Sequence, residues 1–252
     1  MSNELKGLYK LGGAGFIVSG VLFLSRDILE LMAGPPPSGG VEILGWVDSG
    51  KLALSLVSEV LFFAVVALVP AVIALYRSLA STERAKAATG CGIIAAVIPV
   101  IVMLLIVHGR LVYPVYGIRV SSPDVAANIV AVFYGGMHAV DEMMGIATLV
   151  LSVAMMRGDY GKRIAFLGIA TGVLDFIGAF PYLIGSTLTL VCQVFFAAWF
   201  VAVGLKLYGM RWLVDTGHSD LGASPRPSPN KRLQSDSRAI VGALRALDLI
   251  RL

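Results

Sequence analysis

Charge is scarce in this chain of 252 residues: Asp, Glu, Lys and Arg make up 14% of it, against 57% for hydrophobic residues. An average soluble domain carries roughly 25% charged residues. The mean hydropathy is correspondingly high, at +0.84. This composition excludes an ordinary soluble domain and indicates an integral membrane protein, whose main partner is the lipid bilayer. The net charge of +4 does not indicate nucleic acid, because the basic residues lie between apolar runs and not on one face.

Cysteine is nearly absent as well. The two cysteines, Cys91 and Cys192, both lie within apolar runs, and no CxxC or Cys/His spacing occurs. We therefore expect buried thiols, without a disulfide or a structural zinc site. The sequence also lacks the HExxH motif of zinc proteases and the GxSxG motif of serine hydrolases. No motif calls for a cofactor, and enzymatic activity is not indicated.

The glycine-rich stretch LGGAGFIVSG, residues 11–20, superficially resembles a nucleotide-binding loop. A loop of that kind follows a strand and precedes an acidic residue at a set distance, and neither condition is met here. Small residues also allow two membrane helices to approach closely. We therefore predict that these glycines mediate helix packing.

Long apolar runs follow one another along the first 210 residues. A helix of roughly 20 residues crosses the hydrocarbon core of a bilayer, which is about 30 Å thick. Pro70 and Pro99 lie inside two of the runs and are expected to bend them. Residues 33–50 are rich in Pro and Gly and are predicted to form a loop. The pattern predicts an all-α, polytopic transmembrane helix bundle with six spans, at residues 11–24, 51–76, 89–107, within 124–157, 164–180 and 182–208.

Basic residues at the ends of these runs predict the orientation. They alternate with the spans so that most of them fall on one side, which is cytoplasmic by the positive-inside rule. Both termini are then cytoplasmic, and the chain is a multi-pass protein of the cell membrane, the plasma membrane. The residues on this side are Lys6, Lys10, Arg77, Arg84, Lys86, Arg157, Lys162, Arg163, Lys206 and Arg211.

The chain divides by composition into a membrane domain, residues 1–210, and a polar segment, residues 211–252. From about Gly217 this segment is rich in Ser and Pro, a composition that buries too little apolar surface to fold alone. We predict a disordered cytoplasmic tail. Its last residues, AIVGALRALDLIRL, have the composition of a short basic amphipathic helix at the inner membrane surface.

The segment 124–157 is almost wholly apolar but carries His138, Asp141 and Glu142 in its interior. An ionised group at the middle of a bilayer costs roughly 2.5 to 3.5 kcal/mol on insertion scales, so these side chains are expected to face protein or water. At about 100° per residue, one narrow stripe of the helix collects polar and small residues. We predict that the stripe faces the rest of the protein and that Val132, Ala139, Met143 and Val150 face lipid. The stripe consists of Tyr134, His138, Asp141, Gly145, Thr148 and Ser152, with Glu142 at its flank.

Other ionisable residues fall at a similar depth. Counting about 20 residues back from Arg157 places His138 and Asp141 in the outer half of the fourth span. Arg26, Asp27 and Glu30 lie at the outer end of the first span. The candidate ligand or proton pathway consists of His138, Asp141, Glu142, Asp175, Glu59, His108 and Arg110.

The Met-His-Ala step at 137–139, the short basic turn that follows, and the stretch GKRIAFLGIATGVLDFIGAF resemble a family of uncharacterised prokaryotic six-span integral membrane proteins, described as a domain of unknown function. The resemblance covers roughly residues 7–208. It implies a His in the fourth span and an Asp in the fifth, at the positions of His138 and Asp175. It implies no activity, substrate or cofactor. Asp141 and Glu142 are additions to that pattern.

Three interpretations of the polar residues remain open. In a purely structural membrane scaffold, Arg26, His108, Arg110 and His138 would pair with the buried carboxylates. In an outward-facing pocket, the Asp and His side chains would bind or conduct a small solute or a proton. In a membrane-embedded, metal-dependent hydrolase, the same His and Asp residues would surround a metal ion. Haem ligation by His108 and His138 is a weaker variant, permitted by their common depth.

Overall fold

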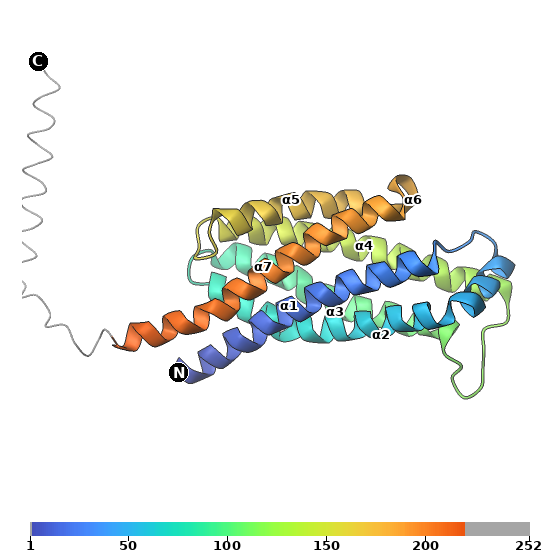
Figure 1. Ribbon diagram of the computed structural model, residues 1–252, viewed down its shortest axis with the longest axis horizontal. Helices are drawn as coiled ribbons and strands as arrows, with labels where there is room; N and C mark the ends of the chain where they lie inside the picture. Colours follow the sequence, from blue (N-terminus) through green and yellow to red (C-terminus); the bar gives the residue numbers. More distant parts are fainter. Residues whose placement is uncertain (1, 220–252) are drawn as a thin grey trace, which may run out of the picture. The chain divides into compact units, whose positions relative to one another are not determined.

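The computed structural model describes residues 2–219, with side chains for residues 3–210. Contacts divide the chain into two units at Trp212, and the description below concerns the first. This unit is built from helices, and no strand occurs among the described residues (Figure 1). The helices are α1 (Ser2–Ala33), α2 (Gly40–Leu79), α3 (Arg84–Val112), α4 (Pro123–Met155), α5 (Lys162–Gly178), α6 (Pro181–Ile184) and α7 (Ser186–Ser219).

Four helices are long and apolar enough to cross a membrane: α2, α3, α4 and the Ser186–Met210 part of α7. The all-α prediction and the membrane character of the chain are thereby confirmed. Helix α1 has 32 residues and α5 has 17, and both pack within the same bundle. Helices α2 and α3 continue without interruption through Pro70 and Pro99.

Glycines allow α1 to lie directly against two other helices, as predicted for the stretch 11–20. A Cβ atom on Gly13 would lie 2.6 Å from the backbone nitrogen of Tyr208 and 2.7 Å from the carbonyl oxygen of Gly204 on α7. On the other side of α1, the Ser19 hydroxyl donates a hydrogen bond of 2.7 Å to the carbonyl of Ala64 on α2. Helix α1 therefore joins α2 to α7 by backbone-to-backbone packing.

The remaining contacts close a ring of six long helices. A Cβ on Gly136 of α4 would meet Leu104 of α3. A Cβ on Gly145 of α4 would lie 3.2 Å from the Gly172 carbonyl on α5. The Thr171 hydroxyl of α5 donates to the carbonyl of Phe195 on α7, at 3.1 Å. Each helix thus contacts the next along the chain, and α7 returns to α1, so that six helices surround one interior.

Two sequence predictions about boundaries were wrong. Residues 40–50 are helical instead of forming a loop, because Ile43 and Val47 face inward and pack on a small cluster that includes Leu111 and Ala126. The predicted span 182–208 is broken near its start, where Gly185 has φ of +81° between α6 and α7. That conformation is left-handed and favours glycine.

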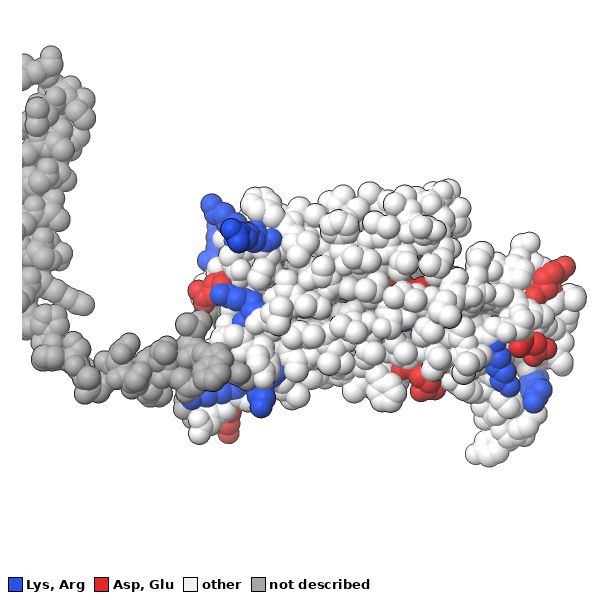
Figure 2. Space-filling view, viewed as in Figure 1, with Lys and Arg blue, Asp and Glu red and all other residues white. Residues whose placement is uncertain are grey.

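Helix α7 continues past residue 210, through the first residues of the predicted tail, to Ser219. Residues 220–252, which include the rest of that tail and the predicted amphipathic helix, lie outside the described residues. Figure 2 shows Lys and Arg gathered at the end of the bundle where α1 begins, and few charged atoms along its middle.

Candidate functional site

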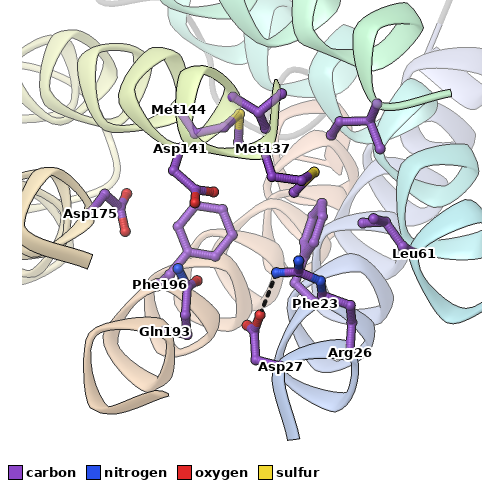
Figure 3. A pocket seen from close by; sticks show the side chains of 12 residues that line it. Phe23, Arg26, Asp27, Leu61, Met137, Asp141, Met144, Asp175, Gln193 and Phe196 are labelled. Atoms are coloured by element: carbon purple, nitrogen blue, oxygen red, sulfur yellow. Dashed lines mark hydrogen bonds and ion pairs between the residues drawn. The ribbon is translucent and has the colours of Figure 1, made fainter. Parts of the chain in front are cut away.

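A small cavity lies in the interior of the ring, and all six long helices contribute to its lining. Its volume is about 30 Å³. Since one water needs at least 10 to 15 Å³ of such space, the cavity has room for about two waters. Five of its lining side chains are polar, in an otherwise apolar bundle interior (Figure 3). These are Arg26, Asp27, Asp141, Asp175 and Gln193.

Helix α1 contributes an ion-paired corner to this cavity. The Arg26 guanidinium donates from Nη1 to Asp27 at 2.7 Å and from Nη2 to Glu30 at 2.6 Å. The Arg26 and Asp27 side chains are each 11% exposed. One cation is thus held between two carboxylates, and the third guanidinium nitrogen, Nε, is buried without a partner among the described residues. These ion pairs fix the position of the guanidinium group at the edge of the cavity.

Helix α4 contributes Asp141, which is only half-buried as a residue but lines the cavity. Its carboxylate interacts electrostatically with Arg26, Asp27 and Glu30 of α1 and with His138 one turn away. In the described part of the chain it makes no direct hydrogen bond, unlike the two carboxylates of α1.

Helix α5 contributes Asp175, the most deeply buried acidic group of the site. It is 2% exposed. Neither of its carboxyl oxygens finds a hydrogen-bond partner among the described residues. Figure 3 shows the carboxyl groups of Asp141 and Asp175 turned toward the same space, with the Gln193 amide beside them. A bare ionised carboxylate in such surroundings is very costly. Asp175 therefore requires a proton, a cation or a water in the cavity.

Close packing explains why α5 brings Asp175 to this position. A Cβ on Gly145 of α4 would lie 3.3 Å from the Asp175 Cβ, and a Cβ on Gly172 of α5 would lie 3.0 Å from the Gly145 carbonyl. The absence of side chains at both positions allows the two helices to touch, which places Asp175 within the bundle and not at its surface. Gly168, Gly172 and Asp175 lie on one face of α5 and are all buried, so this face is the one that packs against the bundle.

His138 lies beside the cavity and not on its lining. Its Nδ1 donates a hydrogen bond of 2.6 Å to the carbonyl of Ala179, just after the end of α5. Its Nε2 lies 3.5 Å from the Glu142 carboxylate, and its ring contacts Phe180 with a centroid distance of 4.8 Å. His138 thus connects α4 to the turn between α5 and α6.

The other predicted site residues lie elsewhere in the bundle. His108 is 1% exposed, forms a 2.8 Å hydrogen bond with Ser58 and stacks on Phe133. Glu59 accepts a hydrogen bond of 3.0 Å from the Tyr113 hydroxyl. Arg110 lines a second cavity, at one end of the bundle. The structure therefore brings together Asp141 and Asp175, with His138 and Glu142 adjacent. Glu59 and Arg110 do not line this cavity; His108 does not line it either but lies within electrostatic range of Arg26.

Three polar cavity residues, Arg26, Asp27 and Gln193, were not among the predicted site residues. Arg26 and Asp27 were placed at the right depth, and Arg26 was assigned to structural ion pairing in the scaffold interpretation. Three charges within five residues of an apolar helix, Arg26, Asp27 and Glu30, were the available signal. Of the pairings that the scaffold interpretation predicted, the one found is between His138 and Glu142.

The predicted inward-facing stripe of α4 is confirmed in the C-terminal half of the helix, where Gly145, Thr148 and Ser152 are buried. On the opposite face, Val132 is 54% exposed, as predicted. The assignment of Met143 to lipid was wrong. Met143 is half-buried and packs against the main core, because the ring of neighbours covers a wider arc of α4 than the stripe alone.

The metal-dependent interpretation gains no support from the geometry. Among the described side chains, those of residues 3–210, no group of three or more His, Cys, Asp or Glu lies close enough to hold a metal ion. Comparisons with protein-family models, with curated proteins and with solved structures each found no match for this chain.

Proposed function

We propose that this protein is a six-span protein of the cell membrane, with both termini in the cytoplasm, and that its central cavity passes protons across the bundle. The four candidate spans and the packing of α1 and α5 between them support the span number. A helix of 17 residues is about 26 Å long, close to the thickness of the hydrocarbon core. The distribution of Lys and Arg supports the orientation.

The observation that carries the proposal is Asp175. Its two carboxyl oxygens are buried without partners at a cavity with room for about two waters. A cavity of this size excludes most organic solutes, whose pockets measure roughly 300 to 1,000 Å³. A proton carried by water needs no more room than this, so we favour a proton over a solute.

In the proposed mechanism, Asp175 takes up a proton that enters from outside and is relayed by a water of the cavity, and it thereby avoids burying a bare charge. Asp141 lies on the same water-sized space and exchanges the proton with Asp175 through that water. The paired Arg26 guanidinium stabilises the negative charge that remains when a proton leaves Asp141. The pair of His138 and Glu142 lies next to Asp141 at the more exposed flank of α4, and it forms the entry to the cavity.

The resemblance to six-span membrane proteins fits this proposal in one respect. The two positions that it singles out, His138 and Asp175, both belong to this region: His138 contacts the residues that follow α5, and Asp175 lies near the end of α5.

Purified protein in liposomes tests the proposal. A potassium gradient with valinomycin sets a membrane potential, and a trapped pH-sensitive dye reports proton entry. We expect wild-type protein to give a proton flux above that of protein-free liposomes, and Asp175→Asn to abolish it, because an amide cannot carry the proton. Asp159→Asn makes the same chemical change at an exposed position of the turn after α4 and should leave the flux unchanged.

Two results would contradict the proposal: wild-type flux equal to that of protein-free liposomes, or equal flux from wild type and Asp175→Asn. In either case the cavity is a packing feature. Circular dichroism and size-exclusion chromatography of each variant establish that a loss of flux is not a loss of fold.

A further inference from the structure

A second cavity lies at the end of the bundle where α2 and α4 begin. It has a volume of about 290 Å³. The first turns of α2, the last turn of α3 and residues 113–121 surround it. It plays no part in the proton pathway proposed above, and it is close to the lower limit of small-molecule pockets, roughly 300 Å³.

The charged side chains of this cavity are mostly basic. Lys51, Arg110 and Arg119 line it together with one acid, Asp48. Three cations and one anion leave a net charge of +2 on the lining. Among the described residues, none of the three basic side chains has a hydrogen bond or ion pair, whereas Arg26 in the central cavity is held by two carboxylates. The cavity thus holds an uncompensated positive charge.

Apolar residues form the floor beneath these charges. Val47, Leu111 and Val112 line the cavity and belong to a buried cluster with Ile43 and Ala126. A ligand that fills this site would therefore meet donors at the rim and hydrocarbon below. Such a lining suits an anionic group attached to an apolar body better than it suits a fully hydrated ion.

The segment that closes the cavity is held in place. The Tyr113 hydroxyl donates to the Ser55 carbonyl at 3.2 Å and to Glu59 at 3.0 Å. A tight turn follows, in which Tyr116 and Gly117 have φ of +52° and +78°. Ser121 lines the cavity two residues before α4 begins. The N-terminal end of α4 carries a partial positive charge that adds to the field of the basic side chains.

We propose that this cavity binds a phosphate group, supplied by the headgroup of an anionic phospholipid or by a soluble phosphate. The planar guanidinium groups of Arg110 and Arg119 present paired N–H donors that match the oxygens of a phosphate. Lys51 adds a compact positive charge. The net charge of the lining is matched by a phosphate with one or two negative charges.

Protein in lipid nanodiscs tests the site and its source. The thermal unfolding midpoint is measured in discs of phosphatidylcholine, in discs that also contain phosphatidylglycerol, and in phosphatidylcholine discs with added inorganic phosphate at constant ionic strength. Native mass spectrometry counts the phosphatidylglycerol molecules retained. If phosphatidylglycerol raises the unfolding midpoint and inorganic phosphate does not, the ligand is a lipid headgroup. If inorganic phosphate raises the midpoint, the ligand is a soluble anion.

The double variant Arg110→Gln, Arg119→Gln should lose the response. A charge-assisted hydrogen bond to each arginine corresponds to about a tenfold change in dissociation constant. Arg163→Gln is the matched control, because it removes an exposed arginine next to the start of α5 and should keep the full response. The double variant with Lys at both positions keeps the charge but not the paired donors, and it should bind with intermediate affinity.

The proposal is overturned if wild-type protein responds to neither probe, or if the Gln double variant responds as wild type does. If the Gln variant fails to fold, the Lys variant decides: an unchanged dissociation constant would show that the arginine donors do not contact the ligand.

Discussion

The contact between α1 and α7 leads to a quantitative prediction about Gly13. An added methyl group there would lie 2.6 Å from the Tyr208 nitrogen and 2.7 Å from the Gly204 oxygen, whereas ordinary contact begins at 3.4 Å. Both obstacles are backbone atoms of α7, so no side-chain rotation relieves them. Helix α7 would have to move by about 0.8 Å to bring the shorter contact to 3.4 Å.

The expected cost follows from a comparison within α1. Overpacking of this kind costs about 1 to 3 kcal/mol. Replacing Gly by Ala also favours the helix by up to about 1 kcal/mol, at any interior position. Gly7 provides the control, because a Cβ there meets nothing within 4 Å. Gly7→Ala should therefore equal or exceed wild-type stability, and Gly13→Ala should be less stable than Gly7→Ala by about 1 to 3 kcal/mol.

Thermal or denaturant unfolding in one detergent, followed by circular dichroism, measures the difference. The reciprocal change, Gly204→Ala, should have a similar effect, because its Cβ would lie 2.7 Å from the Gly13 carbonyl. The double variant should cost less than the sum of the two, since one displacement of α7 relieves both clashes. Equal stability of Gly7→Ala and Gly13→Ala would refute the close packing of α1 on α7.

Two further predictions concern the ends of the bundle. Glu83 accepts hydrogen bonds from Lys86 at 2.5 Å and Arg157 at 3.0 Å, which hold the pKa of its carboxyl below the ordinary value of 4.5. The stabilising contribution of the Glu83 carboxylate is present above pH 4.5 and is lost as the pH falls through the lowered pKa. Wild type and Glu83→Gln should therefore differ in unfolding midpoint at neutral pH and converge in acid. A difference in midpoint that does not change with pH would contradict the prediction. A single cysteine at Ser38 should react with an impermeant maleimide added outside intact cells. A single cysteine at Ser81 should react only after the cells are permeabilised. The reverse pattern would refute the proposed orientation.

The sequence by itself determined the class of this protein and much of its helix packing. Apolar runs with few charges specify helices, because a bilayer leaves no other partner for the backbone groups. The inward face of α4 followed from the 3.6-residue period, which is a local property of the helix. The role of the glycines at 11–20 also followed from the sequence, since a helix surface without side chains allows close approach wherever its neighbour lies.

Helix boundaries were less predictable. The start of α2 at Gly40 depends on Ile43 and Val47 packing against α3 and α4, a contact between segments distant in the chain. The break before α7 depends on one residue, Gly185, whose left-handed conformation was not visible in an otherwise continuous apolar run.

Only the tertiary structure decided which polar residues meet. Sequence reasoning placed Asp141, Asp175 and His108 at a similar depth, but depth leaves the lateral order of the helices open. The ring order puts α5 against α4 through Gly145 and Gly172, so Asp175 joins Asp141, whereas His108 on α3 turns to Ser58 of α2. Which helix lies beside which depends on the sum of many side-chain contacts, and no periodicity within a single helix encodes that sum.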